Sequence, residues 1–338
     1  MTIQEAIQNI IDGISLSVDE TREIFNAIMS GDATEAQIGA FIVALRMKGE
    51  TIEEITGAAE VMRDKAIHVM PSQKKHVVDT CGTGGDRSNT FNISTATAFV
   101  TAGAGAVVAK HGNRSVSSKS GSADVLEALG VTIGADPSVM KACLDEIGIC
   151  FLFAPMLHKA MKYAIGPRKQ IGIRTIFNIL GPLTNPSIAQ SQLLGVFSPN
   201  LTSPLANVLK NMGTKRAFVV HGNDGLDEIS LSSPTTISEL KDGEVSTYTI
   251  EPEQFGLTKH SPTAIMGGDS QKNASMIQDI FSGTPGPCRD IVVLNSAFAI
   301  AASGLTSTPE DGIRLAKESI DSGKAREKLA QLVAMSKG

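Results

Sequence analysis

The sequence predicts an α/β protein with two domains: a small amino-terminal helical domain of residues 1–70 and a larger domain of residues 71–338 with a mostly parallel central sheet. Four helix-starting motifs follow one another within the first 70 residues. Beyond them, short apolar runs alternate with helical patterns, which is the element order of a parallel sheet. A chain of 338 residues is long enough to give both domains a buried core.

The predicted helices of the first domain begin at capping boxes. In each box a Ser or Thr side chain satisfies a free N–H of the opening turn, and a Glu or Gln three residues later reaches back to the cap. The boxes are Thr2 with Glu5, Ser17 with Glu20, Thr34 with Gln37, and Thr51 with Glu54. Glycines at 13, 31 and 49 stand where the first three helices should end, and Pro71 follows the fourth. Each helix carries one apolar stripe, so these helices must pack together or on a neighbouring element.

The elements of the second domain follow from its apolar runs. The predicted strands are Val77–Val78, Ala106–Ala109, Ile149–Phe153, Leu193–Phe197 and Ala217–Val220. Between them we expect one helix opened by Asp136 and Pro137, and another from about Asn200 to Met212. An Asp-Gly turn makes residues 241–250 a predicted hairpin or edge insertion. Closing helices are expected near Ala274–Phe281, Asp290–Ala302, Pro309–Ser322 and Arg326–Met335.

Residues of about 156–186 do not fit the α/β pattern. They form a long helical region that is predicted to break at Gly166–Pro167 and that closes with the string GPLTNP. A single crossover helix would be enough to connect the two strands on either side. We therefore expect this excursion to leave the α/β domain.

Composition and cysteine usage limit the class of protein. The chain has 30 Lys and Arg residues and 35 Asp and Glu residues, so its net charge is −5. An acidic net charge gives no sign of a basic surface that would bind nucleic acid. The four cysteines form no CxxC pair, which favours reduced thiols in a cytoplasmic protein, with Cys81 as a packing residue. No targeting segment and no apolar run long enough to cross a bilayer is found, so we expect no membrane partner.

Two polar loops in the stretch from Val77 to Leu129 predict a site for phosphate. The glycines Gly82, Gly84 and Gly85 follow the first predicted strand, and a small-residue helix begins near Ser94. Backbone N–H groups in a glycine turn and at a helix amino terminus both favour an anion. The second loop, residues 110–122, adds the donors Lys110, His111, Asn113 and Arg114. The alternatives are a plain strand-to-helix turn and a solvent-exposed Lys110.

Asp227 and Glu228 are adjacent carboxylates in a glycine-rich segment after a predicted strand. Magnesium takes one or two carboxylates together with phosphate oxygens of a substrate. Neighbouring side chains in a strand point to opposite faces, so both carboxylates reach one site only if this segment is a loop. The alternative is a solvated acidic turn.

Several strings resemble the signature of the anthranilate phosphoribosyltransferase family. They are GTGGD (82–86), NIST (92–95), KHGNRSVSS (110–118) and GSADVLEALG (121–130), and the stretch 158–186 and GLDEIS (225–230) extend the match over nearly the whole chain. The resemblance implies a nucleoside-phosphorylase-like fold, an excursion packed on the amino-terminal helices and a binding cleft between domains. It also implies a homodimer formed through the helical domain.

The resemblance implies that anthranilate attacks 5-phosphoribosyl 1-pyrophosphate (PRPP) and displaces pyrophosphate, with two Mg²⁺ ions per active site. No side chain is assigned as a covalent nucleophile, acid or base. The implied PRPP contacts are Gly82, Gly85, Asp86, Thr90, Asn92, Ile93, Ser94, Thr95, Lys110, His111, Gly112, Asn113, Arg114, Ser115, Val116, Ser117, Ser118 and Ser122. The implied metal ligands are Ser94, Asp227 and Glu228.

The implied anthranilate contacts are Gly82, Asn113, Arg168, Pro155, His158 and Tyr163. Arg168 is the predicted partner of the carboxylate because its planar fork donates two parallel hydrogen bonds. The alternatives are that Arg168 forms a surface ion pair and that His158 is an ordinary helix-surface histidine.

Two other functions compete with this interpretation. A pyrimidine nucleoside phosphorylase would share the architecture, but Arg168 after Gly-Pro, the GPLTNP string and the Asp227–Glu228 pair argue against it. A nucleic-acid-binding relative is disfavoured by the net acidity and by the scarcity of stacking aromatics, with no Trp and two Tyr. We expect no fused glutaminase domain.

Overall fold

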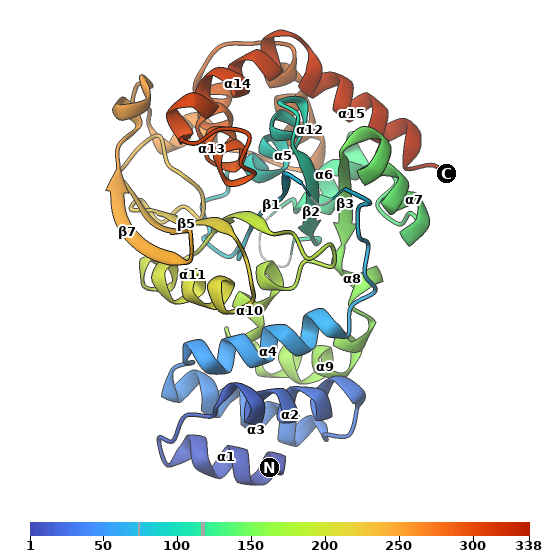
Figure 1. The fold of residues 1–338 in the computed structure, drawn as a ribbon, viewed down its shortest axis with the longest axis vertical. Helices are drawn as coiled ribbons and strands as arrows, with labels where there is room; N and C mark the ends of the chain where they lie inside the picture. Colours follow the sequence, from blue (N-terminus) through green and yellow to red (C-terminus); the bar gives the residue numbers. More distant parts are fainter. Residues whose placement is uncertain (74, 116–118) are drawn as a thin grey trace.

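The computed structural model describes residues 1–73, 75–115 and 119–338 and has a helical bundle next to a layered α/β domain (Figure 1). The bundle consists of α1 (Ile3–Ile11), α2 (Val18–Ser30), α3 (Glu35–Lys48) and α4 (Ile52–Asp64). All four predicted capping boxes are confirmed, with both hydrogen bonds formed in each. Gly31 and Gly49 end α2 and α3 with positive φ angles of 87° and 91°, as predicted.

The sheet has seven strands in the order β3-β2-β1-β4-β5-β6-β7. The first five run parallel, which confirms the mostly parallel sheet, and the last two are antiparallel. Their bounds are β1 Val77–Gly82, β2 Val107–Gly112, β3 Ile149–Phe153, β4 Ser191–Gly195, β5 Arg216–Gly222, β6 Thr235–Lys241 and β7 Glu244–Ile250. The hairpin turn at Asp242 and Gly243 is confirmed, whereas all of β6 except Lys241 precedes the predicted segment of residues 241–250.

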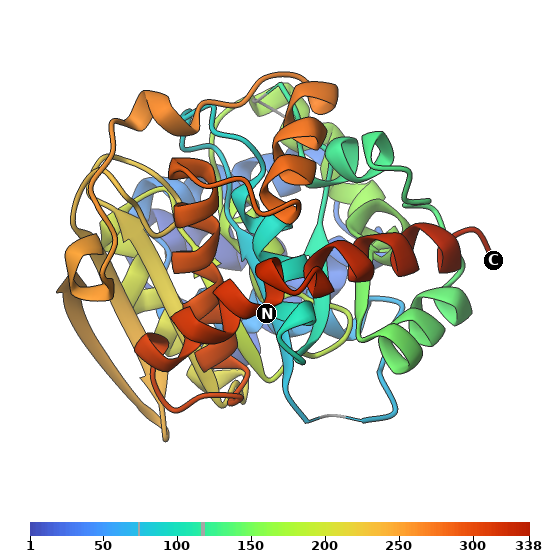
Figure 2. The same cartoon turned by 90° about the horizontal axis from the view of Figure 1, so that it is seen from above.

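Helices cover both faces of the sheet. On the upper face in Figure 1, α13 packs on α5 and α14, and α15 also packs on α5 (Figure 2). On the lower face, α11 contacts β5 and β6 and also α4 of the bundle. The bounds are α5 Ile93–Gly103, α6 Ser122–Ala128, α7 Pro137–Ala142, α11 Thr202–Asn211, α12 Ser270–Phe281, α13 Pro287–Ala302, α14 Pro309–Asp321 and α15 Lys324–Met335. The predicted helices are therefore present, with ends shifted by a few residues.

The excursion contains α8 (Ala154–Leu157), α9 (Lys162–Ile171) and α10 (Phe177–Leu180). The predicted break at Gly166–Pro167 is wrong, because α9 runs through both residues and ends at Gly172, whose φ of 67° is left-handed. A proline inside a helix removes one backbone hydrogen bond. Packing of α9 on α2 and α3 stabilises the helix despite that loss.

The excursion and the bundle share one apolar core. The Phe177 ring lies 5.8 Å from the ring of Phe25 in α2, and Gln170 donates to Glu35 of α3 at 3.4 Å. This core continues through α11 to the lower face of the sheet. The packing of the excursion on the amino-terminal helices is as expected, whereas the domain boundaries 1–70 and 71–338 stay predictions.

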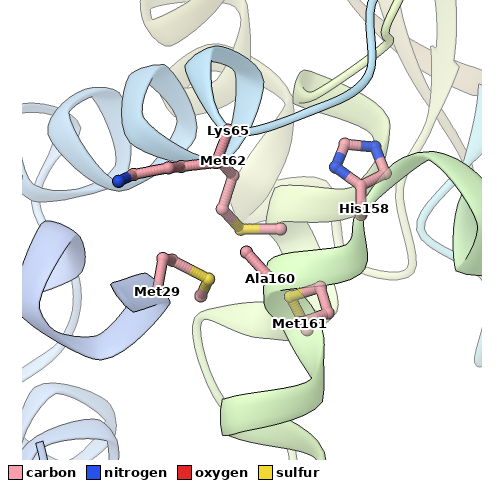
Figure 3. Close-up of a pocket in the computed structure, with 6 residues that line it drawn as sticks. All are labelled: Met29, Met62, Lys65, His158, Ala160 and Met161. Carbon is pink, nitrogen blue, oxygen red and sulfur yellow. The ribbon is translucent and has the colours of Figure 1, made fainter. Parts of the chain in front are cut away.

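Figure 3 shows the junction of the bundle and the excursion, where the side chains of Met29, Met62 and Met161 gather near His158. These side chains leave no room for a water molecule, so the junction is a packing contact and not a ligand site. Methionine side chains are flexible and adapt to irregular gaps. Among the described residues, no helix is long and apolar enough to cross a membrane.

Candidate active site

The candidate site lies where the strand order of the sheet reverses. From β1 the chain proceeds outward through β2 and β3, and β4 then returns to the other side of β1. Open α/β sheets bind ligands at this point, beyond the carboxyl ends of the strands. Gly82 and Gly195 end β1 and β4 as register partners, so the glycine loop begins at this position.

The glycine loop crosses from β1 toward β4. The Thr83 N–H donates to the Gly195 carbonyl at 2.9 Å, and Gly84 and Gly85 follow with φ angles of 65° and 78°. Glycine adopts such left-handed angles at no steric cost because it has no Cβ. The Gly84 N–H donates to the Asp227 carboxylate at 2.8 Å. The structure therefore brings the predicted glycine loop and one predicted metal ligand into direct contact.

Close approach of Asp227 requires the two strand-ending glycines. A Cβ at Gly82 would lie 2.7 Å from Asp227 Oδ2, and a Cβ at Gly195 would lie 1.6 Å from the Asp227 carbonyl oxygen. Neither position has room for a side chain. Gly195 was not among the predicted site residues, because nothing in the local sequence around it marks the approach of a segment 32 residues later.

Asp227 and Glu228 lie in a loop after β5, which meets the condition that both carboxylates serve one site. Loss of hydration and repulsion from Asp86 raise the pKa of Asp227 to about 7. Loss of hydration and repulsion from Asp227 also raise the pKa of Glu228, while Lys110 opposes this shift. Both side chains are half-buried and the Asp227 carboxylate accepts the Gly84 N–H, so the alternative of a solvated acidic turn is wrong. Crowded carboxylates of this kind favour a cation.

The oxygen donors near Asp227 fit a hard cation. Asp227, Glu228 and Ser94 offer carboxylate and hydroxyl oxygens, which are the ligands that Mg²⁺ prefers. Ser94 lies in the first turn of α5, and its backbone opposes the rise in the pKa of Glu228. Within residues 1–73, 75–115 and 119–338, no cluster of three or more His, Cys, Asp or Glu side chains is arranged to hold a metal ion. The remaining ligands of a magnesium ion would then be phosphate oxygens and water.

Lys110 is buried in β2, with 3% of its surface exposed, and its ammonium group donates to the Thr80 carbonyl. The alternative of a solvent-exposed lysine is therefore wrong. Burial lowers the pKa of Lys110, while the charges of Asp79 and Glu228 oppose this shift. The buried Lys110 ammonium group thus lies inside the sheet, close enough to the carboxylates of Asp79 and Glu228 to interact with their charges.

The predicted contacts around α5 divide into two groups. Asn92 and Ser94 are half-buried at the start of the helix. Ile93 and Thr95 are buried, with 1% and 0% of their surface exposed. Any contact of these last two residues with a ligand therefore has to come from the backbone, a distinction that the string NIST alone does not make.

Asp86 and Thr90 belong to the segment between the glycine loop and α5. The Asp86 carboxylate accepts the N–H of Ser88 at 3.3 Å and the N–H of Asp227 at 3.5 Å. Thr90 forms an isolated antiparallel bridge with Met266. The structure thus brings Asp86 to the carboxylate cluster and ties Thr90 to the segment before α12.

The second loop, predicted as residues 110–122, starts later than predicted, because Lys110 and His111 belong to β2, which ends at Gly112; Ser122 is the first residue of α6. Arg114 is exposed and forms ion pairs with Asp124 at 2.8 Å and Glu127 at 2.6 Å, which raise its pKa. The Ser115 N–H donates to Asp124 at 3.3 Å, and the Asn113 carboxamide accepts the Arg114 N–H at 2.7 Å. Of the predicted contacts, Val116, Ser117 and Ser118 lie outside the described residues.

Arg168 is half-buried in α9, with its guanidinium 5.0 Å from the centre of the Phe177 ring. No ion pair forms to Arg168 within the described ranges, so the alternative of a surface ion pair is not supported. Burial lowers its pKa. The guanidinium therefore retains donors for an external carboxylate.

His158 is buried, with 7% of its surface exposed, so the alternative of a helix-surface histidine is wrong. Its Nε2 lies 3.2 Å from the Nε2 of His111, whose Nδ1 faces the Gly181 carbonyl at 3.2 Å. Burial lowers the pKa of His158 to about 4 and that of His111 to about 3. Both rings are neutral at pH 7, and the pair joins β2 to the excursion.

The two remaining predicted anthranilate contacts, Pro155 and Tyr163, belong to the excursion. Pro155 lies exposed in the short helix α8. The Tyr163 ring packs on Gly31 at the end of α2, where a Cβ would lie 2.6 Å from the ring. The structure therefore gives Tyr163 a packing position between α9 and the bundle and does not bring it to the glycine loop.

Two positioning side chains were not predicted. Arg174 donates to the Gly85 carbonyl and lies 4.2 Å from the centre of the Phe197 ring. Asn295 of α13 is fully buried and exchanges two 3.0 Å hydrogen bonds with the backbone of Ile229, next to Glu228. Arg174 lies within a stretch that resembles the family, but neither residue has a local sequence signal, because its partner is distant in the chain.

Comparisons with known proteins match both parts of the chain. The model of the glycosyl transferase family helical bundle domain matches residues 4–66, and that of the glycosyl transferase family a/b domain matches residues 74–326. The anthranilate phosphoribosyltransferase of Acetivibrio thermocellus is 58% identical, over 98% of this chain and 96% of the relative. The crystal structure of the enzyme from Thermus thermophilus is 38% identical with a TM-score of 0.94, over 98% of this chain and 99% of that one.

The Saccharomyces cerevisiae enzyme has been solved with bound ligands. Its complex with PRPP and Mg is 28% identical, with a TM-score of 0.90 over 99% of this chain and 98% of that one. Its complex with 4-fluoroanthranilate is 26% identical, with a TM-score of 0.88 over 99% and 97% of the two chains. On sequence identity over nearly its whole length and on the fold, this chain belongs to the anthranilate phosphoribosyltransferase family.

Proposed function

We propose that the loops after β1, β2 and β5 bind PRPP with Mg²⁺ and that the excursion binds anthranilate. The chain then transfers the 5-phosphoribosyl group of PRPP to the amino group of anthranilate and releases pyrophosphate. The observation that carries this proposal is the contact between the glycine loop and Asp227 at the ends of β1 and β4. The relatives named above support the substrates, since one of them was solved with PRPP and Mg and with an anthranilate analogue.

In this proposal the phosphate groups of PRPP lie between the glycine loop and the second loop. Gly85 follows Gly84 in the same left-handed turn, and glycine turns of this kind present backbone N–H groups that bind anions, whereas the Gly84 N–H itself donates to Asp227. Arg114 is exposed at the second loop. The predicted contacts on the second loop include three residues that the structure does not describe, so the full set of PRPP contacts stays a prediction.

Asp227, Glu228 and the Ser94 hydroxyl are the proposed ligands of magnesium, with two ions per active site. When bound, Mg²⁺ neutralises the negative charge that develops on the leaving pyrophosphate. The carboxylates of Asp227 and Glu228 would hold the positive charge of the metal close to the glycine loop, since Asp227 accepts the Gly84 N–H. The charge of Lys110, in β2, offsets part of the repulsion between the Asp227 and Glu228 carboxylates.

Arg168 is the proposed partner of the anthranilate carboxylate, with Asn113, Pro155 and the backbone of Gly82 as further contacts. A half-buried guanidinium without an acidic partner is suited to a bidentate pair with a carboxylate. His111 and His158 are neutral at pH 7, and the neutral aromatic amine of anthranilate is itself a nucleophile. No side chain of this chain is therefore assigned as a general base.

A double variant tests the proposed function directly. Asp227→Asn with Glu228→Gln keeps one oxygen acceptor and the size of each side chain while it removes both negative charges, so the protein should fold and lose magnesium-dependent product formation. The measurement is formation of phosphoribosyl anthranilate during a magnesium titration, with circular dichroism as the folding control. A folded double variant with unchanged activity and magnesium dependence would contradict the assignment.

We further propose a homodimer formed through the bundle in the cytoplasm. The bundle exposes apolar side chains at Ile11, Ile14 and Met47, with 65%, 54% and 83% of their surface accessible. Burial of such a group of side chains favours self-association. All four cysteines are free, in keeping with a reducing compartment. Sedimentation equilibrium would test the dimer, and a monomer at micromolar concentration would contradict it.

A further inference from the structure

Asn273, in the first turns of α12, is a buried amide with two partners. Only 1% of its surface is exposed. Its Oδ1 accepts the Gly268 N–H at 2.7 Å, and its Nδ2 donates to Oδ1 of Asn92 at 3.0 Å. Residues 92 and 273 are 181 positions apart in the sequence. The interaction therefore links the carboxyl-terminal helices to a proposed PRPP contact.

The chain of amide hydrogen bonds continues from Asn92 to the second loop. The Nδ2 of Asn92 donates to the Ser120 carbonyl at 3.2 Å, and the Ser120 hydroxyl lies 3.4 Å from Oδ1 of Asn92. Asn92 precedes α5, yet its side chain makes no capping hydrogen bond to the helix. The side chain instead connects the two loops on either side of the proposed phosphate site.

The backbone around Asn273 supports the same segment. Thr90 forms its bridge with Met266, the Phe91 N–H donates to the Ile265 carbonyl at 3.2 Å, and the Gly267 N–H donates to the Asn89 carbonyl at 2.9 Å. A Cβ at Gly267 would lie 2.7 Å from both Asn273 Oδ1 and the Phe91 nitrogen. Residues 89–92 are thus fixed in place by residues 265–273.

We propose that Asn273 is a positioning residue for PRPP, which fixes the separation of the two phosphate-binding loops through Asn92 and Ser120. The inference rests on the proposed role of Asn92 as a PRPP contact. An amide is required at 273 because the position must accept from Gly268 and donate to Asn92. A carboxylate can only accept.

Rearrangement of Asn92 does not compensate for a carboxylate at position 273. If the Asn92 amide turned over to donate to that carboxylate, its Oδ1 would face the Ser120 carbonyl. Two acceptors would then oppose each other, and the hydrogen bond between the loops would be lost. Asn273→Asp is therefore an isosteric variant that removes the connection while preserving shape.

The experiment measures PRPP binding by calorimetric titration in the presence of Mg²⁺, together with thermal melting of the same samples. For Asn273→Asp and Asn273→Ala we expect the Kd for PRPP to rise about five- to tenfold, as for the loss of one or two hydrogen bonds. The KM for anthranilate at saturating PRPP should change little. Asn273→Asp keeps the test available if Asn273→Ala does not fold.

Ser319→Ala is the matched control. Ser319 is buried and donates one 2.7 Å hydrogen bond to the Val100 carbonyl in α5. Loss of this hydrogen bond to α5 should lower the melting temperature. Ser319 has no hydrogen bond to either phosphate-binding loop, so the loops should keep their positions. The Kd for PRPP should stay within about twofold of that of the unmodified protein, because no interaction at the loops is lost.

Asn92→Ala separates failure of this inference from failure of the proposed site. If Asn92→Ala weakens PRPP binding and both Asn273 variants bind normally, the positioning role is overturned while the site stands. If Asn92→Ala binds PRPP normally, the proposed contact is wrong and the inference is overturned with it. The double variant Asn92→Ala/Asn273→Ala should bind no more weakly than Asn92→Ala alone, since Asn273 acts through Asn92.

Discussion

Binding of PRPP with magnesium should weaken as the pH falls below 7, because Asp227 has to be ionised to bind the cation. Its pKa is raised to about 7 in the free protein by loss of hydration and by the neighbouring Asp86. With that pKa, about one carboxyl group in eleven is ionised at pH 6 and about ten in eleven at pH 8. The apparent Kd should therefore be about tenfold larger at pH 6 than at pH 8, a difference of about 1.4 kcal/mol.

The direction of this effect follows from the sign of the pKa shift. A raised pKa means that the free site binds a proton more readily than an ordinary aspartate, and bound magnesium displaces that proton. At pH 7 about half a proton should be released for each PRPP bound with its metal, as expected for a group titrating at its pKa. Glu228, whose pKa is also raised, changes the affinity in the same direction.

Calorimetric titration at pH 6, 7 and 8, in buffers of different ionisation enthalpy, measures both the affinity and the proton release. Asp227→Asn is the control, because Asn still accepts the Gly84 N–H and cannot titrate, while protonation of PRPP itself is the same in both experiments. The variant should bind more weakly at pH 8, with less pH dependence. Equal pH dependence and equal proton release in the two proteins would refute the reasoning.

Two further variants test the two halves of the site. Arg168→Ala should raise the KM for anthranilate with little change in the affinity for PRPP, because a bidentate ion pair is lost while the phosphate-binding loops stay intact; steady-state kinetics with each substrate varied would contradict this if both affinities fell equally. Gly85→Ala should cost on the order of 1 kcal/mol in folding, since φ is 78° at this position. It should also lose PRPP binding beyond that cost, because the new Cβ, 3.1 Å from the Arg174 guanidinium, would displace the side chain that donates to the Gly85 carbonyl and positions the glycine loop. A variant that melts near the unmodified protein and binds PRPP normally would show that the glycine serves only the turn.

Much of the secondary structure could be predicted because its signals are local. Each capping box places donor and acceptor three residues apart, so Ser17 and Glu20 define the start of α2 without any tertiary contact. The helix α9 was not predicted correctly, because there a tertiary contact overrides the local signal. Pro167 is locally unfavourable in a helix, but packing of α9 against α2 and α3 outweighs the loss of one hydrogen bond.

The burial of individual site residues could not be predicted from the motifs. The string NIST names four neighbouring residues, yet α5 buries Ile93 and Thr95 while Asn92 and Ser94 remain half-buried. Lys110 and His158 similarly occupy positions that are exposed in many proteins. Their burial depends on the segments that cover them, and those segments are distant in the sequence.

By itself the sequence determined the helix starts, the parallel strands, the glycine loop and, through its resemblance to a family, the candidate site residues. Only the tertiary structure decided which of these groups meet. Asp227 reaches the Gly84 N–H across 143 residues because β4 returns beside β1, and Asn273 reaches Asn92 because α12 packs on α6, the helix that follows the second loop. A motif encodes contacts between near neighbours in the chain, whereas these contacts depend on strand order and helix packing, which arise only when the whole domain buries its apolar surface.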